Sequence, residues 1–281
     1  MGKTSLYLSR FAQTAYVCWK VVVNILRMPL YALLHREYFR AWRKALVANV
    51  INMEKDCQSA IPMLDCVALQ EMLGGQDPAI AFKFGSKYGN INFVESIVVA
   101  YIVKSLKPRM VFEIGTFDGF SAYHLAMNSP DDAEIYTLNL PINDNGDSSF
   151  RRTSLTEFHG DATTHDELLD RGVGTIYKHS PQGHKVKQLF GDSLTYDFSP
   201  FKGKMDLVFI DGGHSLTCIT KDTSSATEML SSRGVILWHD FNIQHRDIYR
   251  FLSQFSGSHR IYWIKDTRLA LYRRGDGKTT E

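Results

Sequence analysis

Short apolar runs alternate with amphipathic stretches along most of this chain. Five of these segments have strand character and end abruptly at polar or turn residues. They cover residues 110–114, 134–140, 187–190, 205–210 and 234–238, and 187–190 is apolar only at its last two residues. Apolar runs of this length, bounded by turn residues, are typical of strands buried in a parallel sheet. Because segments of helical character lie between the runs, the pattern predicts an α/β fold with alternating strands and helices.

The hydrophobic pattern changes near the end of the chain. Residues 246–255 are predicted to form a helix, and residues 260–264 and 269–273 then alternate as two strands. The short turn 265–268 joins these strands, so we expect an antiparallel hairpin to close the sheet. Upstream, residues 92–106 are expected to form a helix that leads to Pro108 and the first strand.

The first 90 residues differ from the rest in charge and pattern. Residues 1–50 carry eight Lys or Arg and one acid, a net charge of +7, so the remainder of the chain carries −5. Residues 6–28 show a basic polar stripe at helical spacing, ended near Pro29, and residues 31–73 also look helical. Residues 1–90 are therefore expected to form a basic amphipathic helical arm and cap. Contact with an anionic membrane surface through 6–28 and packing against protein, including a second subunit, are both left open.

Composition excludes several classes. A hydrophobic fraction of 44% and a charged fraction of 22% are ordinary for a globular chain. Charges interrupt the apolar N-terminal segment, which argues against a spanning helix, and no clear secretory signal is present. The four cysteines lack any C-x-x-C spacing, so we expect a reducing, cytoplasmic location, with the inner membrane face as the site of any peripheral contact. No nucleic-acid-binding module is recognisable.

The turn after the predicted strand 110–114 has the strongest chemical signal. The strand reaches Glu113, and Gly115 and Gly119 then allow close approach of the backbone before Ser121 opens a helix. A dinucleotide site requires G-x-G-x-x-G, and Phe117 stands where the middle glycine would be. This turn therefore predicts a nucleoside ligand and disfavours a nicotinamide cofactor.

Two neighbouring strands end in acids that are close to histidines. Asp211 ends one strand and precedes His214, whereas His239 and Asp240 end the next strand. The carboxyl ends of parallel strands form the usual ligand edge of such a sheet. Two hypotheses follow: Asp211, Asp240 and His239 hold Mg²⁺, or His214 or His239 acts as a general base while the acids position it.

Residues 141–185 form a long polar excursion between two predicted strands. They contain four histidines, namely His159, His165, His179 and His184. Segments of this length are usually functional lids or solvated insertions. A cover over an acceptor is the functional interpretation, and an insertion whose histidines bind nothing is the alternative.

Three motifs together resemble a known family. The pattern E-x-G-x-x-x-G-x-S at 113–121, D-G-x-H-S at 211–215 and W-H-D at 238–240 resemble class I S-adenosylmethionine (AdoMet) dependent methyltransferases. The likeness is greatest to the catechol O-methyltransferase-like group and to a bacterial group with the last two motifs. It implies a Rossmann-like, doubly wound sheet of seven strands over residues 91–275, mostly parallel with an antiparallel C-terminal hairpin, and with 141–185 as an insertion.

The resemblance also implies AdoMet as cofactor and assigns residues to its site. These are Glu113, Gly115, Thr116, Gly119, Ser121, Asn139, Asp192 and Asp211. In the resembled family an acid usually holds the ribose hydroxyls, and here Asn139 takes that position. Asp192 matches a residue near the adenine amino group, with a simple turn aspartate as the alternative. The family follows its second metal-binding Asp with Asn, whereas Phe241 follows Asp240 here and Asn242 stands one place further. The third ligand is therefore open between His239 and Asn242.

The implied reaction is in-line methyl transfer to a hydroxyl of a small molecule or saccharide, including a lipid-linked one, with His214, His239 and Asp240 as catalytic residues. Two alternatives stay open. One is a metal-dependent hydroxylase-like enzyme on the same scaffold, because the cephalosporin hydroxylase-like group carries similar Asp-x-x-His-Ser turns. The other is a non-catalytic AdoMet-binding protein. A homo-oligomer is compatible with each of them.

Overall fold

The structure is a computed structural model that describes residues 61–74, 79–81, 83, 89–141, 172–242 and 244–276. The chain divides into a unit of residues 1–58 and a unit of residues 59–281, and every described residue belongs to the second unit. The expected helix over 6–28 and most of the expected insertion, 142–171, lie outside the described residues. Among the residues that are described, no helix is long and apolar enough to cross a membrane.

The described strands form one mixed sheet of eight strands in the order β1-β7-β8-β6-β5-β2-β3-β4. Neighbouring strands from β6 through β4 pair in parallel, whereas β8 runs antiparallel to both β6 and β7. The seven expected strands and the closing hairpin are thus confirmed, and β1 is an addition. The strand bounds are β1 Met63–Leu64, β2 Met110–Ile114, β3 Glu134–Asn139, β4 Val186–Phe190, β5 Met205–Ile210, β6 Leu230–Trp238, β7 Ile261–Ile264 and β8 Ala270–Arg273.

Strand β1 lies inside the stretch 31–73 that was expected to be helical. It pairs in parallel with β7, and Lys265 donates its backbone N–H to the carbonyl oxygen of Leu64 at 2.8 Å. The helix α3 (Cys66–Met72) begins directly afterwards, with the Asp65 side chain accepting from the backbone N–H of Ala68. The exposed edge of β7 provides backbone groups for pairing, so this short segment becomes a strand despite its helical pattern.

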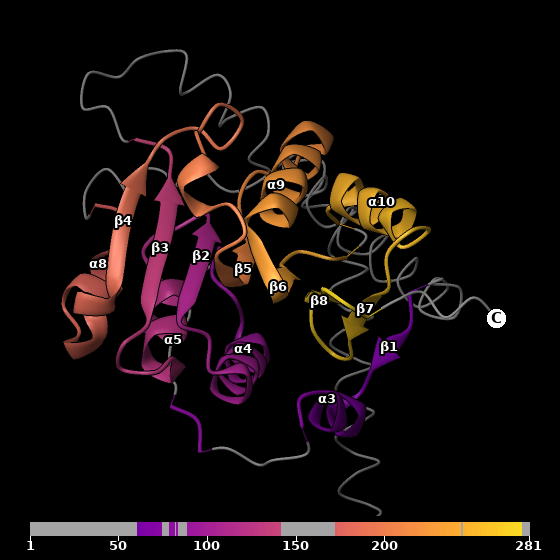
Figure 1. The fold of residues 1–281 in the computed structure, drawn as a ribbon, viewed down its shortest axis with the longest axis horizontal. Coiled ribbons are helices and arrows are strands. Elements are labelled where there is room, and N and C mark those ends of the chain that lie inside the picture. Colours follow the sequence, from indigo (N-terminus) through magenta and orange to yellow (C-terminus); the bar gives the residue numbers. More distant parts are fainter. Residues whose placement is uncertain are drawn as a thin grey trace, which may run out of the picture. The chain divides into compact units, whose positions relative to one another are not determined.

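Helices cover both faces of the sheet (Figure 1). Helices α4 (Phe93–Leu106) and α5 (Phe120–Asn128) pack on one face, where Val99 and Leu125 meet Val111 of β2. Helices α9 (Leu216–Met229) and α10 (Arg246–Phe255) pack on the other face, against the second core cluster. Successive strand residues point to opposite faces, so each buried strand contributes to both cores, as its continuous apolar run predicts.

The end of the expected insertion supports the glycine-containing turn. It forms the short helix α8 (Thr175–Lys178) and a 3-10 turn over Pro181–Lys185. Gly174 donates its backbone N–H to the carbonyl oxygen of Phe117 at 3.0 Å. A Cβ on Gly119 would lie only 2.5 Å from the Tyr177 ring, so this glycine permits the contact. The described part of 141–185 therefore braces the turn after β2.

Candidate active site

The turns after the parallel strands meet at the carboxyl edge of the sheet. Backbone hydrogen bonds link them in strand order: Gly191 donates to Asn139, Gly115 to Leu138, Asp211 to Ile114 and His239 to Ile210, at 2.8–3.0 Å. This ladder places the residues that follow β2, β3, β4, β5 and β6 side by side. The sheet edge therefore gathers motifs that are more than 100 residues apart in the sequence.

The packing of the protein backbone requires a glycine at position 115 of this edge. Its φ is +100°, and a Cβ built on it would lie 2.0 Å from the carbonyl oxygen of Asp211. The sequence argument assigned this glycine to close approach of a ligand. The structure gives another reason, because the backbone of the turn after β5 occupies the space where a side chain would be.

Four of the residues assigned to the cofactor are buried beneath the turn: Glu113, Thr116, Gly119 and Ser121. The hydroxyl of Thr137 donates to Glu113 Oε2 at 2.5 Å and lies 2.6 Å from Thr116 Oγ1. Burial raises the pKa of Glu113 to about 8, so this carboxyl is protonated at neutral pH. These groups support the turn from inside the domain.

The other assigned residues lie where a ligand can reach them. Asn139 Oδ1 accepts the backbone N–H groups of Thr116 and Phe117, both at 3.2 Å, so its amide fixes the turn after β2. Exposed Asp192 accepts the backbone N–H of Leu194 at 2.9 Å, which is the geometry of a turn aspartate. Gly115, Asn139 and Asp211 are partly exposed.

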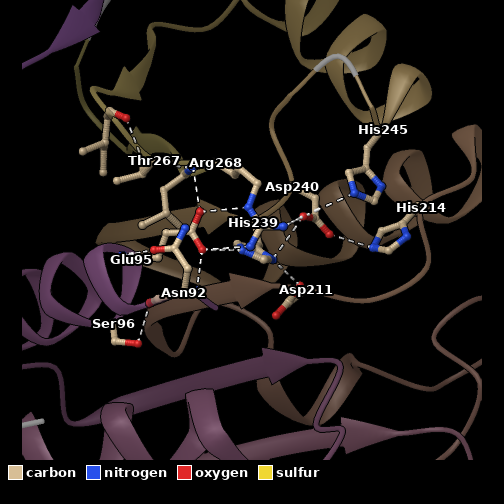
Figure 2. Close-up of polar contacts among 12 residues, drawn as sticks. Asn92, Glu95, Ser96, Asp211, His214, His239, Asp240, His245, Thr267 and Arg268 are labelled. Atoms are coloured by element: carbon tan, nitrogen blue, oxygen red, sulfur yellow. Dashed lines mark hydrogen bonds and ion pairs between the residues drawn. The ribbon is translucent and has the colours of Figure 1, made fainter. Parts of the chain in front are cut away.

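A group of seven charged or titratable side chains occupies the β5–β6 part of the edge. We call it the polar cluster (Figure 2), and it consists of Glu95, Asp211, His214, His239, Asp240, His245 and Arg268. Its members come from α4, from the turns after β5 and β6, from the start of α10 and from the β7–β8 turn. They surround Asp240 and His239.

His239 lies between two carboxylates. Its side chain is 2% exposed, with Nδ1 2.8 Å from Asp211 Oδ1 and Nε2 3.1 Å from Glu95 Oε2. Burial lowers the pKa of His239, but the charges of Asp211 and Asp240 and the two hydrogen bonds outweigh it and raise the pKa to about 10. Ionised carboxylates only accept hydrogen bonds, so both ring nitrogens carry protons. His239 is a buried imidazolium.

Glu95 is fully buried at the start of α4 and neutralises two cations. Its carboxylate accepts from Arg268 through the backbone N–H at 2.9 Å and through Nε and Nη2 at 3.0 Å, besides facing His239. It also accepts the backbone N–H of Asn92 in a capping box. Burial raises the pKa of Glu95, but the bonds and charges of His239 and Arg268 lower it to about 2.

Asp240 is the centre of the polar cluster. Its Oδ1 accepts from Arg268 Nη1 at 2.8 Å, and its Oδ2 lies 2.9 Å from His214 Nε2. Burial raises its pKa, yet the charge of His239 and the hydrogen bond with His214 hold it well below the usual range. Its φ of +58° is a left-handed conformation that a non-glycine residue adopts under local constraint. The carboxylate is therefore ionised and fixed in direction.

Comparison with known families identifies this region. Residues 112–241, which span β2 to the turn after β6, match the family model described as a methyltransferase domain. We call these residues the methyltransferase domain after this match. The match confirms the resemblance carried by the three motifs, and the sheet edge described above is the edge of that domain. No curated protein sequence matches the chain.

Several solved methyltransferase structures resemble the methyltransferase domain at low identity. The O-methyltransferase from Bacillus cereus in complex with SAH is 14% identical, covers 66% of this chain and 83% of its own, and has a TM-score of 0.46. The O-methyltransferase TomG from Streptomyces achromogenes is 16% identical, its match covers 66% of this chain and 81% of TomG, and the TM-score is 0.43. The methyltransferase PaMTH1 from Podospora anserina is 15% identical, its match covers 81% of this chain and 94% of PaMTH1, and the TM-score is 0.45. At these values we draw no conclusion about substrate.

The methyltransferase domain brings Asp211, His214, His239 and Asp240 together, as expected from their strand ends. Three further members of the polar cluster were not predicted: Glu95, His245 and Arg268. The Asn-x-x-Glu spacing of Asn92 and Glu95 is a capping signal that could have indicated the start of α4 at this edge. His245 and Arg268 lie in turns, where no periodic pattern marks them.

The expected Mg²⁺ ligands do not fit that ion. The ligand atoms of Asp211, His239 and Asp240 lie within 4.8 Å of one another. However, His239 is a nitrogen donor, and its raised pKa keeps a proton on the nitrogen that faces Asp211. A metal ligand must be deprotonated, and Mg²⁺ prefers oxygen donors. We therefore assign no step of the reaction to Mg²⁺ at these residues.

Proposed function

We propose that the methyltransferase domain transfers the methyl group of AdoMet to a hydroxyl oxygen of a small-molecule acceptor. The observation that carries the proposal is the shared sheet edge. The glycine-containing turn after β2 and the polar cluster after β5 and β6 lie on it, within a segment that matches a methyltransferase family. Holding donor and acceptor side by side is the main contribution a protein makes to such a transfer.

The cofactor in this proposal lies against the reachable residues of the edge. Gly115 lines its path, Asn139 bonds the ribose hydroxyls through its amide, and Asp192 accepts from the adenine amino group. Asp211 bounds the site on the side of the polar cluster. The buried Glu113, Thr116, Gly119 and Ser121 act on the cofactor in this proposal by holding the turn in shape.

Methyl transfer to a hydroxyl forms a C–O bond, breaks the C–S bond of the sulfonium and releases the hydroxyl proton. His239 is poorly placed to act as base, because it is buried and both ring nitrogens face carboxylates. The side chain of His214 is 26% exposed and is aligned by Asp240. We therefore assign activation of the acceptor hydroxyl to His214 and Asp240, with His239 as a positioning residue.

We further propose that the acceptor is a small metabolite or a saccharide, including a lipid-linked saccharide, and that the protein works in the cytoplasm.

The net charge of +7 on residues 1–50 supports peripheral contact with an anionic inner membrane face through 6–28. Deleting residues 1–30 should abolish co-sedimentation with anionic liposomes. Unchanged co-sedimentation would instead support the alternative, in which this arm packs on the body or on a second copy.

Release of S-adenosylhomocysteine tests the function. The full chain is incubated with AdoMet and a panel of hydroxylated acceptors, and the variant His214→Ala serves as the comparison. Acceptor-dependent release that falls at least about 100-fold in the variant is expected for loss of hydroxyl activation. A metal-dependent hydroxylase-like enzyme would modify its acceptor without this product. A purely AdoMet-binding protein would bind AdoMet and modify nothing.

A further inference from the structure

His214, Asp240 and His245 converge on one point of the polar cluster. His214 Nε2 lies 2.9 Å from Asp240 Oδ2, and His245 Nε2 lies 3.4 Å from Asp240 Oδ1. One ligand atom from each residue lies within 4.8 Å of the other two. Figure 2 shows the two imidazoles, one from the turn after β5 and one from the start of α10, directed at the same carboxylate.

We propose that His214, Asp240 and His245 bind a divalent transition metal such as Zn²⁺. This proposal rests on the proposed function, because it specifies how the acceptor hydroxyl is activated. Metal–ligand bonds of about 2.0–2.2 Å in a tetrahedral site place the ligand atoms about 3.3 Å apart. His214 Nε2 and Asp240 Oδ2 are already near this separation, and His245 Nε2 lies 3.4 Å from the other oxygen of the same carboxylate. Rotation of the partly exposed imidazoles provides the remaining adjustment.

The donor set selects the kind of metal. Two imidazole nitrogens and one carboxylate oxygen suit Zn²⁺ and its transition-metal neighbours, whereas Mg²⁺ prefers oxygen donors. Three protein ligands leave a fourth position open, which is the arrangement of catalytic zinc sites. The side chains of His214 and His245 are 26% and 20% exposed, so both imidazoles can be reached from solvent.

The surroundings of Asp240 support a metal ligand. Arg268 donates to Asp240 Oδ1 at 2.8 Å, and buried Glu95 in turn accepts from Arg268. These neighbours fix the orientation of the Asp240 carboxylate, so its Oδ2 is directed towards the metal without any contact between them and the metal. The cations His239 and Arg268 would repel a metal if they stood alone. The carboxylates of Glu95 and Asp211 balance them, which leaves the charge of Asp240 for the metal.

An acceptor hydroxyl in the open position would lose its proton to water more readily, because coordination lowers the pKa of a bound hydroxyl. The resulting oxygen attacks the methyl carbon of AdoMet, the C–S bond breaks, and S-adenosylhomocysteine departs. In this scheme His214 and Asp240 activate the hydroxyl as metal ligands, and no histidine has to accept its proton.

The test is metal binding by the full chain after treatment with a chelator. Titration with Zn²⁺ in a calorimeter should show one site per chain, and Co²⁺ should give the visible absorption of a low-coordinate site. His245→Ala should weaken Zn²⁺ at least tenfold and remove the Co²⁺ bands. The matched control is His184→Ala, because His184 is an exposed histidine far from Asp240 in the sequence, and its loss should change neither signal.

Absence of Zn²⁺ binding by the folded chain, or equal affinity in His245→Ala, overturns the metal site. Thermal denaturation of each variant shows whether it is folded, and His245→Gln is the second variant if alanine is not tolerated. AdoMet binding is measured separately on the same samples. AdoMet binding without Zn²⁺ binding overturns this inference alone, whereas Zn²⁺ binding without AdoMet binding supports the site and overturns the proposed function.

Discussion

Glu95→Gln is the most demanding test of the polar cluster. The carboxylate accepts hydrogen bonds from Arg268, His239 and Asn92 while it is fully buried. The amide presents an NH₂ group to donors and leaves buried His239 and partly exposed Arg268 without their shared counter-charge. Breaking a buried pair in this way typically removes about 3–5 kcal/mol of folding free energy. For a domain of this size that corresponds to a fall of about 6–20 °C in Tm.

The pH dependence gives this prediction a second signature. The folded pKa of His239 is raised from 6.5 to about 10, so its contribution to stability is complete below pH 6.5 and is lost as pH rises towards 10. In Glu95→Gln the imidazolium keeps only Asp211 and Asp240, and its folded pKa falls. The difference in stability between wild type and variant should therefore be largest near pH 7 and narrow towards pH 10.

Urea denaturation of both proteins at pH 7, 8.5 and 10 measures this difference. The matched control is Glu134→Gln, which removes the ion pair with Lys187 at 2.7 Å, where both side chains are nearly half exposed. Solvent screens an exposed pair of this kind, so the control should change little. A loss below about 1 kcal/mol for Glu95→Gln, or a difference independent of pH, would refute the assignment of a charged, mutually dependent cluster.

Two further substitutions test the cofactor edge. Gly115→Ala should lower the free energy of unfolding by at least about 3 kcal/mol, because the new Cβ would meet the Asp211 carbonyl. The control Gly203→Ala is also at positive φ but has open space around it, and it should lose only about 1 kcal/mol. Similar urea midpoints for the two variants would contradict this. Asp192→Ala should weaken the affinity for AdoMet at least tenfold in calorimetry, with little change in Tm. The control Asp197→Ala removes the same kind of turn hydrogen bond elsewhere and should leave the affinity for AdoMet unchanged. Equal effects of the two Asp variants would reduce Asp192 to a turn residue.

The strand ends could be predicted because each signal is local. A buried parallel strand is apolar on both faces, and its end is marked by the first polar residues. This rule located Asp211 and Asp240, and neighbouring parallel strands then required them to be close. The helix 246–255 was predicted with the bounds that the structure shows, because its apolar face is regular.

The interior of the polar cluster could not be predicted in this way. Glu95 and Arg268 are 173 residues apart, and their contact depends on how α4 and the β7–β8 turn meet over the sheet. The sequence does not show that His239 lies between two carboxylates. From the sequence alone, a histidine that acts as a general base therefore cannot be distinguished from a buried imidazolium. Strand β1 was missed because two residues have no detectable period.

Calorimetric titration of the full chain with AdoMet tests the central claim most directly, with NAD as the comparison ligand. The account predicts saturable binding of one AdoMet per chain, competition by S-adenosylhomocysteine, and no binding of NAD, since Phe117 replaces the middle glycine of a dinucleotide turn. A folded chain that binds no AdoMet at millimolar concentration, or that binds NAD instead, would contradict it.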